Sequence, residues 1–318
     1  MDNSLVAVQP AAMQTVEKTF DSMIDSWFNS DEMFRVREQS KRSYRKSLKT
    51  FHRWLVGNGI QSPTKQDVKD WCKWMDAQGW SVATKNLRLT TLRNFCKWIS
   101  GEFGVPNIAE NLRGWKDTKE HKRGFLSCGE MKQLLDVVDD STLQGKRDKA
   151  IIGVLLTGGL RTVEVNRLRI SDVIHNGGVT YLNVVGKGRD TGEHVKISRK
   201  AEQLICDWLT ARQVDIAANA NEPLFCSLSG NSFGKPISSN SVSTLCKKYL
   251  TKAGLKTKEI VAHSLRHSLA TNSLMKGASL MEVQQQLRHV NLSTTQIYLH
   301  EAEKAANRCT ELIADEIF

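Results

Sequence analysis

A polar segment that divides the chain constrains its fold more than any other feature. Residues 114–124 begin and end with glycine, and most of the side chains between them are charged or polar. This composition is typical of an exposed linker. Because 318 residues are too many for one ordinary core, we predict two domains, at 19–113 and 125–318, joined by a linker at 114–124 and preceded by an extension at 1–18.

The first half of the chain predicts helices only. Apolar residues recur at helical spacing in three segments: Tyr44, Leu48, Phe51 and Leu55; Val68, Trp71, Cys72 and Met75; Leu89, Leu92, Phe95, Cys96 and Ile99. Such a stripe predicts an amphipathic helix whose apolar face packs into a core. Thr64 is the expected N-cap of the second helix, and Asp67 follows in its first turn.

The second half predicts helices together with a small β element. Residues 145–156 have a helical pattern, and helical patterns return from 204 onward, at 264–274 and at 280–287. Between them, residues 179–185 show an alternating pattern and are rich in β-branched residues. A glycine-rich turn covers 186–192, and residues 194–197 would form the returning strand. That order predicts an antiparallel hairpin. The expected fold class is therefore mainly α with a small antiparallel β-sheet.

The chain carries a formal charge of +11, which favours a polyanionic partner such as nucleic acid. Basic side chains lie opposite the apolar stripes of the first half, and these are the candidate DNA contacts: Lys41, Arg42, Arg45, Lys46, Lys49, Lys85, Arg88 and Arg93. A run of charges is often only the solvated face of a helix. Two basic faces in one small helical domain favour phosphate binding over that interpretation.

The cysteines and the terminal segments indicate a cytoplasmic protein. The seven cysteines are scattered and never show the C-x-x-C spacing of a zinc or redox site. The first residues lack the basic and apolar regions of a secretory signal, and no apolar run is long enough to span a membrane. We therefore expect reduced thiols and no association with a membrane.

Six side chains of the second half suit the cleavage of a phosphodiester bond without a metal. In chain order they are Arg161, Lys187, His263, Arg266, His289 and Tyr298. Guanidinium groups can neutralise the charge that develops on the phosphate oxygens, and the leaving oxygen needs an acid. A tyrosine nucleophile needs a base, because a free tyrosine titrates near pH 10.

The segments that contain these residues resemble the motifs of the tyrosine site-specific recombinases, the phage-integrase family. The matching segments are 157–164 around the first arginine, 185–188 at the hairpin lysine, 263–271 with the pattern H-x-x-R-H, and 287–298, which ends at the tyrosine. The resemblance implies a helical, SAM-like core-binding domain and a mixed α+β catalytic domain that form a C-shaped clamp on DNA. Because only the short extension at 1–18 precedes the predicted core-binding domain, we expect the simple two-domain type, without an arm-binding domain.

The resemblance also implies a reaction. Tyr298 would attack the phosphate and form a 3′-phosphotyrosyl link, while Arg161 and Arg266 clamp its oxygens and His289 adds a hydrogen bond. Lys187 would protonate the leaving 5′-oxygen, and His263 would accept the tyrosine proton. Glu164 and His267 are expected to support the site structurally.

The family acts as a homotetramer on two copies of a specific double-stranded DNA site and passes through a Holliday junction. It uses no cofactor, metal ion or ATP. The sequence does not reveal the DNA site, the accessory proteins, or whether the chain integrates a mobile element, excises, inverts or resolves DNA. The amphipathic tail at 302–318 is compatible with packing on its own domain or on a neighbouring subunit.

One position departs from the family pattern, because Arg288 occupies the place of a glycine that usually precedes the last histidine. If a helix carries this residue, arginine should be tolerated. If the glycine allows a close approach of the backbone, the position of His289 comes into doubt.

Two other functions stay open. A type IB topoisomerase-like nicking-closing enzyme uses nearly the same catalytic set, although the helical first domain and the H-x-x-R-H pattern favour a recombinase. A DNA-binding regulator that never cuts is the alternative from another class, and the presence of all six candidate side chains argues against it. Each of these side chains, considered alone, is also compatible with a structural role.

Overall fold

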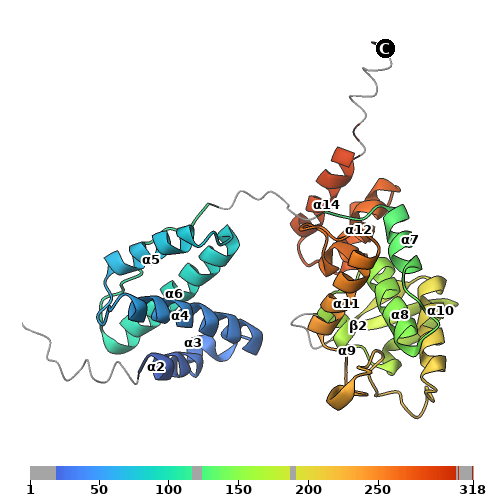
Figure 1. The fold of residues 1–318 in the computed structure, drawn as a ribbon, viewed down its shortest axis with the longest axis horizontal. Coiled ribbons are helices and arrows are strands. Elements are labelled where there is room, and N and C mark those ends of the chain that lie inside the picture. The colour runs from blue at the N-terminus through green and yellow to red at the C-terminus, as the bar shows by residue number, and fades with distance from the viewer. Residues whose placement is uncertain (1–18, 117–123, 187–190, 306, 308–316, 318) are drawn as a thin grey trace, which may run out of the picture. The chain divides into compact units, whose positions relative to one another are not determined.

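The computed structural model describes residues 19–116, 124–186, 191–305, 307 and 317. Its contacts divide the chain into two compact units, residues 1–120 and 121–318, which can be followed in Figure 1 by the colours of the bar. The division lies inside the predicted linker at 114–124, of which 117–123 are outside the described residues, as is the predicted extension at 1–18.

The first unit contains only helices within its described residues. They are α2 (Thr19–Phe28), α3 (Asp31–Phe34), α4 (Glu38–Gly57), α5 (Lys65–Ala77) and α6 (Val82–Phe103). The predicted apolar stripes form the core, in which Leu48, Trp71 and Phe95 are fully buried. The prediction that the first half forms helices is therefore confirmed for the described residues of this unit.

Local signals and aromatic packing explain why these helices form and stay together. Thr64 caps α5 as predicted, because its side chain accepts a hydrogen bond from the Asp67 amide and the Asp67 carboxylate accepts one from the Thr64 amide. The rings of Phe51 and Trp71 meet edge to face at 4.9 Å and join α4 to α5.

The second unit is mostly helical, with one small sheet. Its helices are α7 (Cys128–Asp136), α8 (Leu143–Gly158), α9 (Thr162–Arg167), α10 (Arg199–Ala211), α11 (Ser239–Lys252), α12 (Ala262–Met275), α13 (Leu280–Leu287) and α14 (Leu292–Ala305). Two 3₁₀ turns, η1 (Ile170–Asp172) and η2 (Gly230–Ser232), lie in its connections. The predicted tail at 302–318 lies mainly outside the described residues.

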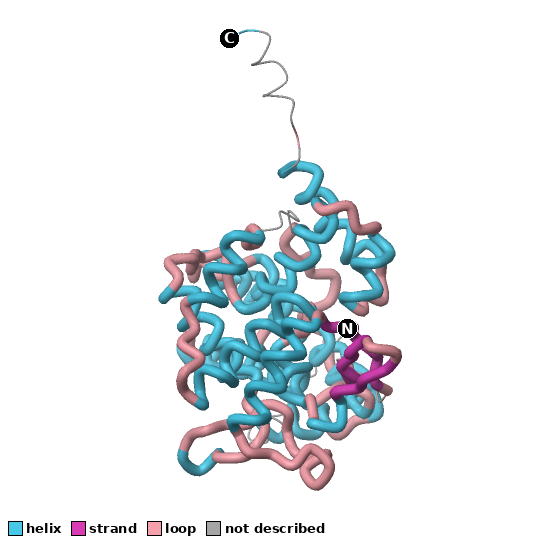
Figure 2. Tube along the Cα trace, turned by 90° about the vertical axis from the view of Figure 1, so that its right-hand side faces the viewer, coloured by secondary structure: helices cyan, strands magenta, loops and turns pink. Residues whose placement is uncertain are grey.

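The sheet is antiparallel, with strands in the order β1 (Val173–Asn176), β2 (Val179–Val185) and β3 (Gly192–Ile197). Figure 2 shows these strands as a small magenta group beside the predominant helices. The pairing of Leu182 with Val195 confirms the predicted hairpin. The sequence did not predict β1, whose four residues are too few to show a clear alternation.

Helix α8 forms the centre of this unit and positions the site. Residues 150–156 are all buried, since α8 packs against α10, α12 and β3. The helix ends at Gly159, whose φ of 63° is left-handed. A Cβ atom there would lie 2.8 Å from the side chains of Leu269 and Leu287, so only glycine fits this turn without rearrangement. The turn leads directly to Arg161, at the start of α9.

Together these elements confirm the predicted fold class, mainly α with a small antiparallel sheet.

Candidate active site

The predicted catalytic residues come from four separate segments of the second unit. Arg161 precedes α9, His263 and Arg266 lie on α12, His289 follows α13, and Tyr298 lies on α14. Helix α12 packs against α8, α13 and α14, which brings these segments together (Figure 1). Lys187 lies outside the described residues.

Arg266 is buried and connects the C-terminal ends of two helices. The residue is 1% exposed, and its two terminal nitrogens donate hydrogen bonds to the carbonyl oxygens of Gly159 and Leu287. These carbonyls end α8 and α13, so one guanidinium satisfies backbone groups that the helices leave unpaired. Burial, followed by the positive charge of Arg161, lowers the pKa of Arg266 to about 9, which leaves it protonated at pH 7.

Glu164 holds two further arginines. Its Oε2 accepts hydrogen bonds from the Arg161 amide and from Nη2 of Arg288, both at 2.7 Å, and its Oε1 accepts one from Nη1 of Arg161 at 2.8 Å. The carboxylate side chain is 0% exposed. Burial alone would raise the pKa of Glu164, but Arg288 and Arg161 together lower it, so the group is ionised at neutral pH.

Arg161 and Glu164 do not form a surface ion pair, because the carboxylate is buried. Arg161 is the most exposed of the three guanidinium groups, with 31% of its side chain accessible. A phosphate can therefore reach Arg161 more directly than it can reach Arg266 or Arg288.

Arg288 is not one of the helical residues of α13, which ends at Leu287. The residue caps the end of α13 with φ 56° and ψ 44°, in the left-handed region that favours glycine. This conformation explains why a glycine would suit the position. The chain then turns, and the His289 amide donates a hydrogen bond to the Gln284 carbonyl at 3.1 Å.

Two histidine rings enclose the predicted nucleophile. Tyr298 is buried, the His267 ring meets it edge to face at 4.6 Å, and the His289 ring stacks on it with a centroid distance of 6.0 Å. Nδ1 of His289 lies 2.9 Å from the hydroxyl of Thr295, on the same helix as Tyr298. These contacts hold the tyrosine beside the last histidine of the motif.

His289 is neutral at pH 7. Burial, and then the positive charges of Arg266, Arg161 and Arg288, lower its pKa to about 4 from an ordinary value of 6.5. A neutral imidazole can donate one hydrogen bond and accept another.

The stability of the folded protein is expected to fall as the pH drops from 6.5 to about 4. In that window the unfolded chain binds a proton that folded His289 does not bind, so protons favour unfolding. Denaturant unfolding at several pH values measures this effect. Replacing His289 with glutamine should remove its share of the pH dependence, and identical pH profiles for the two proteins would contradict the prediction.

Thr295 and Gly159 contribute to the site, although the sequence predictions assigned them no role. Thr295 precedes Tyr298 by three residues on α14, and that spacing places both on one helical face. This spacing could have identified Thr295. The role of Gly159 depends on the turn itself, which the order of residues does not show.

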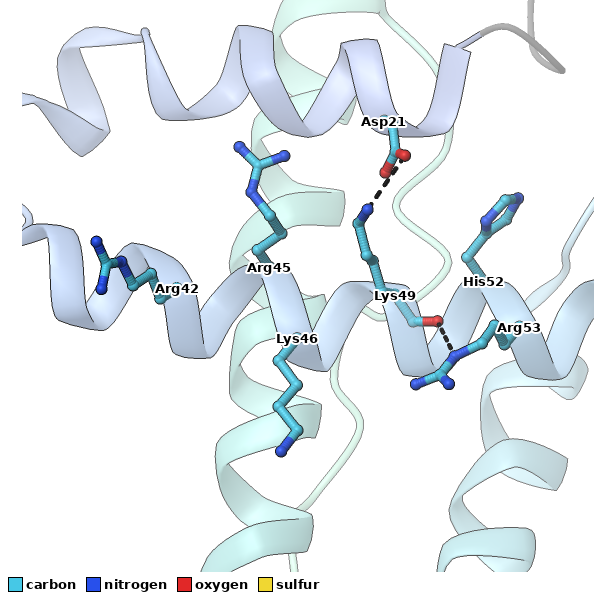
Figure 3. A pocket seen from close by; sticks show the side chains of 7 residues that line it. All are labelled: Asp21, Arg42, Arg45, Lys46, Lys49, His52 and Arg53. Carbon is cyan, nitrogen blue, oxygen red and sulfur yellow. Dashed lines mark hydrogen bonds and ion pairs between the residues drawn. The ribbon is translucent and has the colours of Figure 1, made fainter. Parts of the chain in front are cut away.

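The candidate DNA contacts of the first unit differ in their surroundings. Four of them, Arg42, Arg45, Lys46 and Lys49 on α4, line a pocket together with Asp21, His52 and Arg53. Figure 3 shows Arg45 and Lys49 pointing toward α2, whereas Lys46 points away from it. Arg45 and Lys49 form ion pairs with Asp25 and Asp21, and Lys46 is exposed.

The other candidates have different environments. Lys41 donates a hydrogen bond to the Phe28 carbonyl at 3.0 Å, Arg88 lies over the Trp80 ring, and Arg93 is exposed. Lys85 is not on the exposed face that the pattern predicted. It is buried, and its ammonium pairs with Asp76 at 2.6 Å, because α6 turns this position toward the end of α5.

Within the described residues, no helix combines the length and the apolar character that a membrane span requires. In the same part of the chain, no group of three histidine, cysteine or acidic side chains is arranged to hold a metal ion.

Comparison with protein families matches residues 125–305 to the Phage integrase family, and residues 31–102 to the N-terminal SAM-like domain of phage integrases. Tyrosine recombinase slr0733 of Synechocystis sp. is 29% identical over 293 residues, covering 87% of this chain and 90% of the relative. Tyrosine recombinase XerC of Oceanobacillus iheyensis is 31% identical over 264 residues, covering 81% and 84%.

The fold has solved counterparts as well. A structure of the XerH site-specific recombinase bound to a palindromic difH substrate, in a post-cleavage complex, matches with a TM-score of 0.70 and 22% identity. The match covers 98% of this chain and 92% of that one. With two matching domains and relatives similar over most of their length, the chain belongs to the phage integrase family, the tyrosine recombinases.

Proposed function

We propose that this chain is a site-specific DNA recombinase that cuts and rejoins strands through a phosphotyrosyl intermediate on Tyr298. One observation carries the proposal: Arg161, Arg266, His289 and Tyr298 converge from four segments on one cluster of the second unit. The two arginine side chains of this cluster carry positive charge, which suits a phosphate diester.

Each side chain then has a role in transesterification. Arg161 binds a non-bridging oxygen, and Arg266 uses N–H groups that its two carbonyl partners leave available. His289 is neutral and donates a hydrogen bond to the phosphate, and His263 accepts the proton of Tyr298. Lys187 protonates the leaving 5′-oxygen, a role that rests on the sequence motif alone.

The phosphodiester energy is conserved in this reaction. The tyrosine oxygen forms a bond to phosphorus as the bond to the 5′-oxygen breaks. The free 5′-hydroxyl of another strand can then attack the phosphotyrosine and release Tyr298, so the chemistry needs neither ATP nor a cofactor.

The proposal also assigns the domains and the partners. Residues 19–113 are the core-binding domain, 114–124 the linker and 125–318 the catalytic domain. The partner is double-stranded DNA with a specific site, as the XerH structure contains its difH substrate. We further propose that a homotetramer acts on two sites, in the cytoplasm where its DNA substrate lies.

A covalent trapping assay without metal ions tests the function. The purified protein is incubated in EDTA with nicked DNA fragments from its own genomic neighbourhood and then separated on a denaturing gel. A protease-sensitive protein–DNA band establishes the covalent intermediate, and sequencing of the trapped fragment identifies the site. Tight binding without any such band would overturn the proposal in favour of a regulator that does not cut.

Replacing Lys46 and Lys49 with glutamine is expected to weaken binding to DNA of any sequence. Each lost phosphate contact should reduce the log–log salt dependence of the association constant by about one unit. Fluorescence anisotropy at several salt concentrations measures both effects. Lys73, an exposed lysine on α5 outside the pocket, is the matched control. Unchanged affinity and slope would mean that this face of α4 is only solvated.

A further inference from the structure

The backbone at Arg288 is in a conformation that an arginine adopts at a cost. The left-handed region brings Cβ close to the following carbonyl, a penalty that glycine avoids. A chain that keeps arginine at such a position therefore gains something from the side chain. The contacts of that side chain indicate what the gain is.

The Arg288 guanidinium reaches a different part of the unit. Nη2 contacts Oε2 of Glu164 at 2.7 Å, across 124 positions of sequence, and Nη1 donates to the Gln286 carbonyl at 3.0 Å. The Arg288 side chain is 5% exposed. Each charge of a buried pair depends on its partner far more than a charge at the surface does, because loss of one partner leaves the other buried and unpaired.

Glu164 transmits this contact to the proposed phosphate site. The same carboxylate oxygen accepts the Arg161 amide, and the other oxygen holds the Arg161 guanidinium. Arg288 is followed directly by His289. Through Glu164, the segment that carries His289 is thus attached to the segment that carries Arg161.

A second connection runs in parallel. Arg266 joins the carbonyls of Gly159 and Leu287, which belong to the same two segments. Two independent connections between a pair of segments restrict rotation as well as separation. One connection alone would leave the segments free to pivot.

We propose that Arg288 is a positioning residue, which fixes His289 relative to Arg161 by sharing the carboxylate of Glu164. The inference rests on the proposed function, since it gives these residues a common substrate phosphate. It extends that function, because the contact depends on an arginine at a position where the family usually has glycine.

The charges around His289 provide a way to observe this arrangement. His289 is faced by Arg161 from the start of α9, by Arg266 and His263 from α12, by its neighbour Arg288, and by the Tyr298 ring from α14. Loss of the Arg288 charge should therefore raise the pKa of His289 in the protein without DNA.

The test compares Arg288→Gly with Arg212→Gly. Both arginines cap the end of a helix and pair with a glutamate, but Arg212 lies at the end of α10 and pairs with Glu222. Glycine suits the backbone at 288, and Glu164 keeps both contacts with Arg161, so the variant should fold. Two quantities are measured: the rate of covalent adduct formation on saturating nicked DNA, and the pKa of His289 by NMR titration.

For Arg288→Gly we expect the adduct to form about 10- to 100-fold more slowly, since small errors of alignment have large effects on rate. The affinity for DNA should stay within about threefold, because phosphate contacts elsewhere dominate it. The pKa of His289 should rise. Arg288→Lys keeps the charge, so it should keep the pKa of His289 low and recover part of the rate. Arg212→Gly should change neither quantity.

The outcomes separate the two proposals. A native rate in Arg288→Gly, or an unchanged pKa of His289, overturns the positioning role, as does an equal loss of rate in Arg212→Gly. If the native protein forms no adduct at all, the proposed function fails instead. The NMR titration then still decides whether Arg288 sets the environment of His289.

Discussion

Replacing Tyr298 with phenylalanine is expected to abolish the covalent protein–DNA product and to leave DNA affinity nearly unchanged. The substitution removes only the hydroxyl oxygen that would attack phosphorus. We expect adduct formation to fall by at least about 10³-fold, the scale on which loss of a nucleophile acts. The ring remains, so its packing against His267 at 4.6 Å should preserve the local structure.

The measurement is the trapping assay in EDTA, together with binding of intact DNA by both proteins. Tyr181→Phe is the matched control, because Tyr181 lies on β2 and is only partly buried. It should form the adduct at the native rate. An equally strong adduct band from Tyr298→Phe would show that another residue is the nucleophile.

The second large effect is expected in stability. Glu164→Gln should lower the free energy of unfolding by about 3–5 kcal/mol, the usual result of removing one partner from a buried ion pair. The glutamine would leave Arg288 buried without a counter-charge and would place amide N–H groups beside guanidinium donors. Denaturant unfolding of the full chain measures the difference.

Glu222→Gln provides the control, because Glu222 also pairs with an arginine but has 42% of its side chain exposed. Its loss should change stability by less than about 1 kcal/mol. Equal losses for the two variants would mean that the buried position of Glu164 has no special effect.

The pH dependence of the Glu164 contribution has a definite sign. The pKa of Glu164 is lower in the folded state than its ordinary value of 4.5, so its contribution is complete above that pH and is lost as the pH falls through the folded value. The difference between the native protein and Glu164→Gln should therefore narrow in acid.

Several elements could be predicted from the sequence because their signals are local. The stripe of Leu48, Phe51 and Leu55 predicted α4, and the alternation in 179–185 predicted β2. The cap at Thr64 depends on residues three positions apart. β1 was missed because four residues give too little periodicity.

The candidate site could be predicted only in part. The spacing of the four motifs identified the side chains, since phosphate chemistry needs guanidinium groups, an imidazole and a nucleophile. It did not reveal that Arg266 also holds two backbone carbonyls, or that Lys85 is buried against Asp76. Both facts depend on which segments pack together.

The sequence by itself determined the helical character of the first unit, the hairpin, and the family to which the chain belongs, because these follow from periodicity and from the order of motifs. Only the tertiary structure revealed the contacts of Arg288. A left-handed cap at the end of α13 directs its guanidinium to Glu164, 124 positions away. Burial and charge pairing arise between segments that are distant in sequence, and such pairs become visible only when the chain is folded.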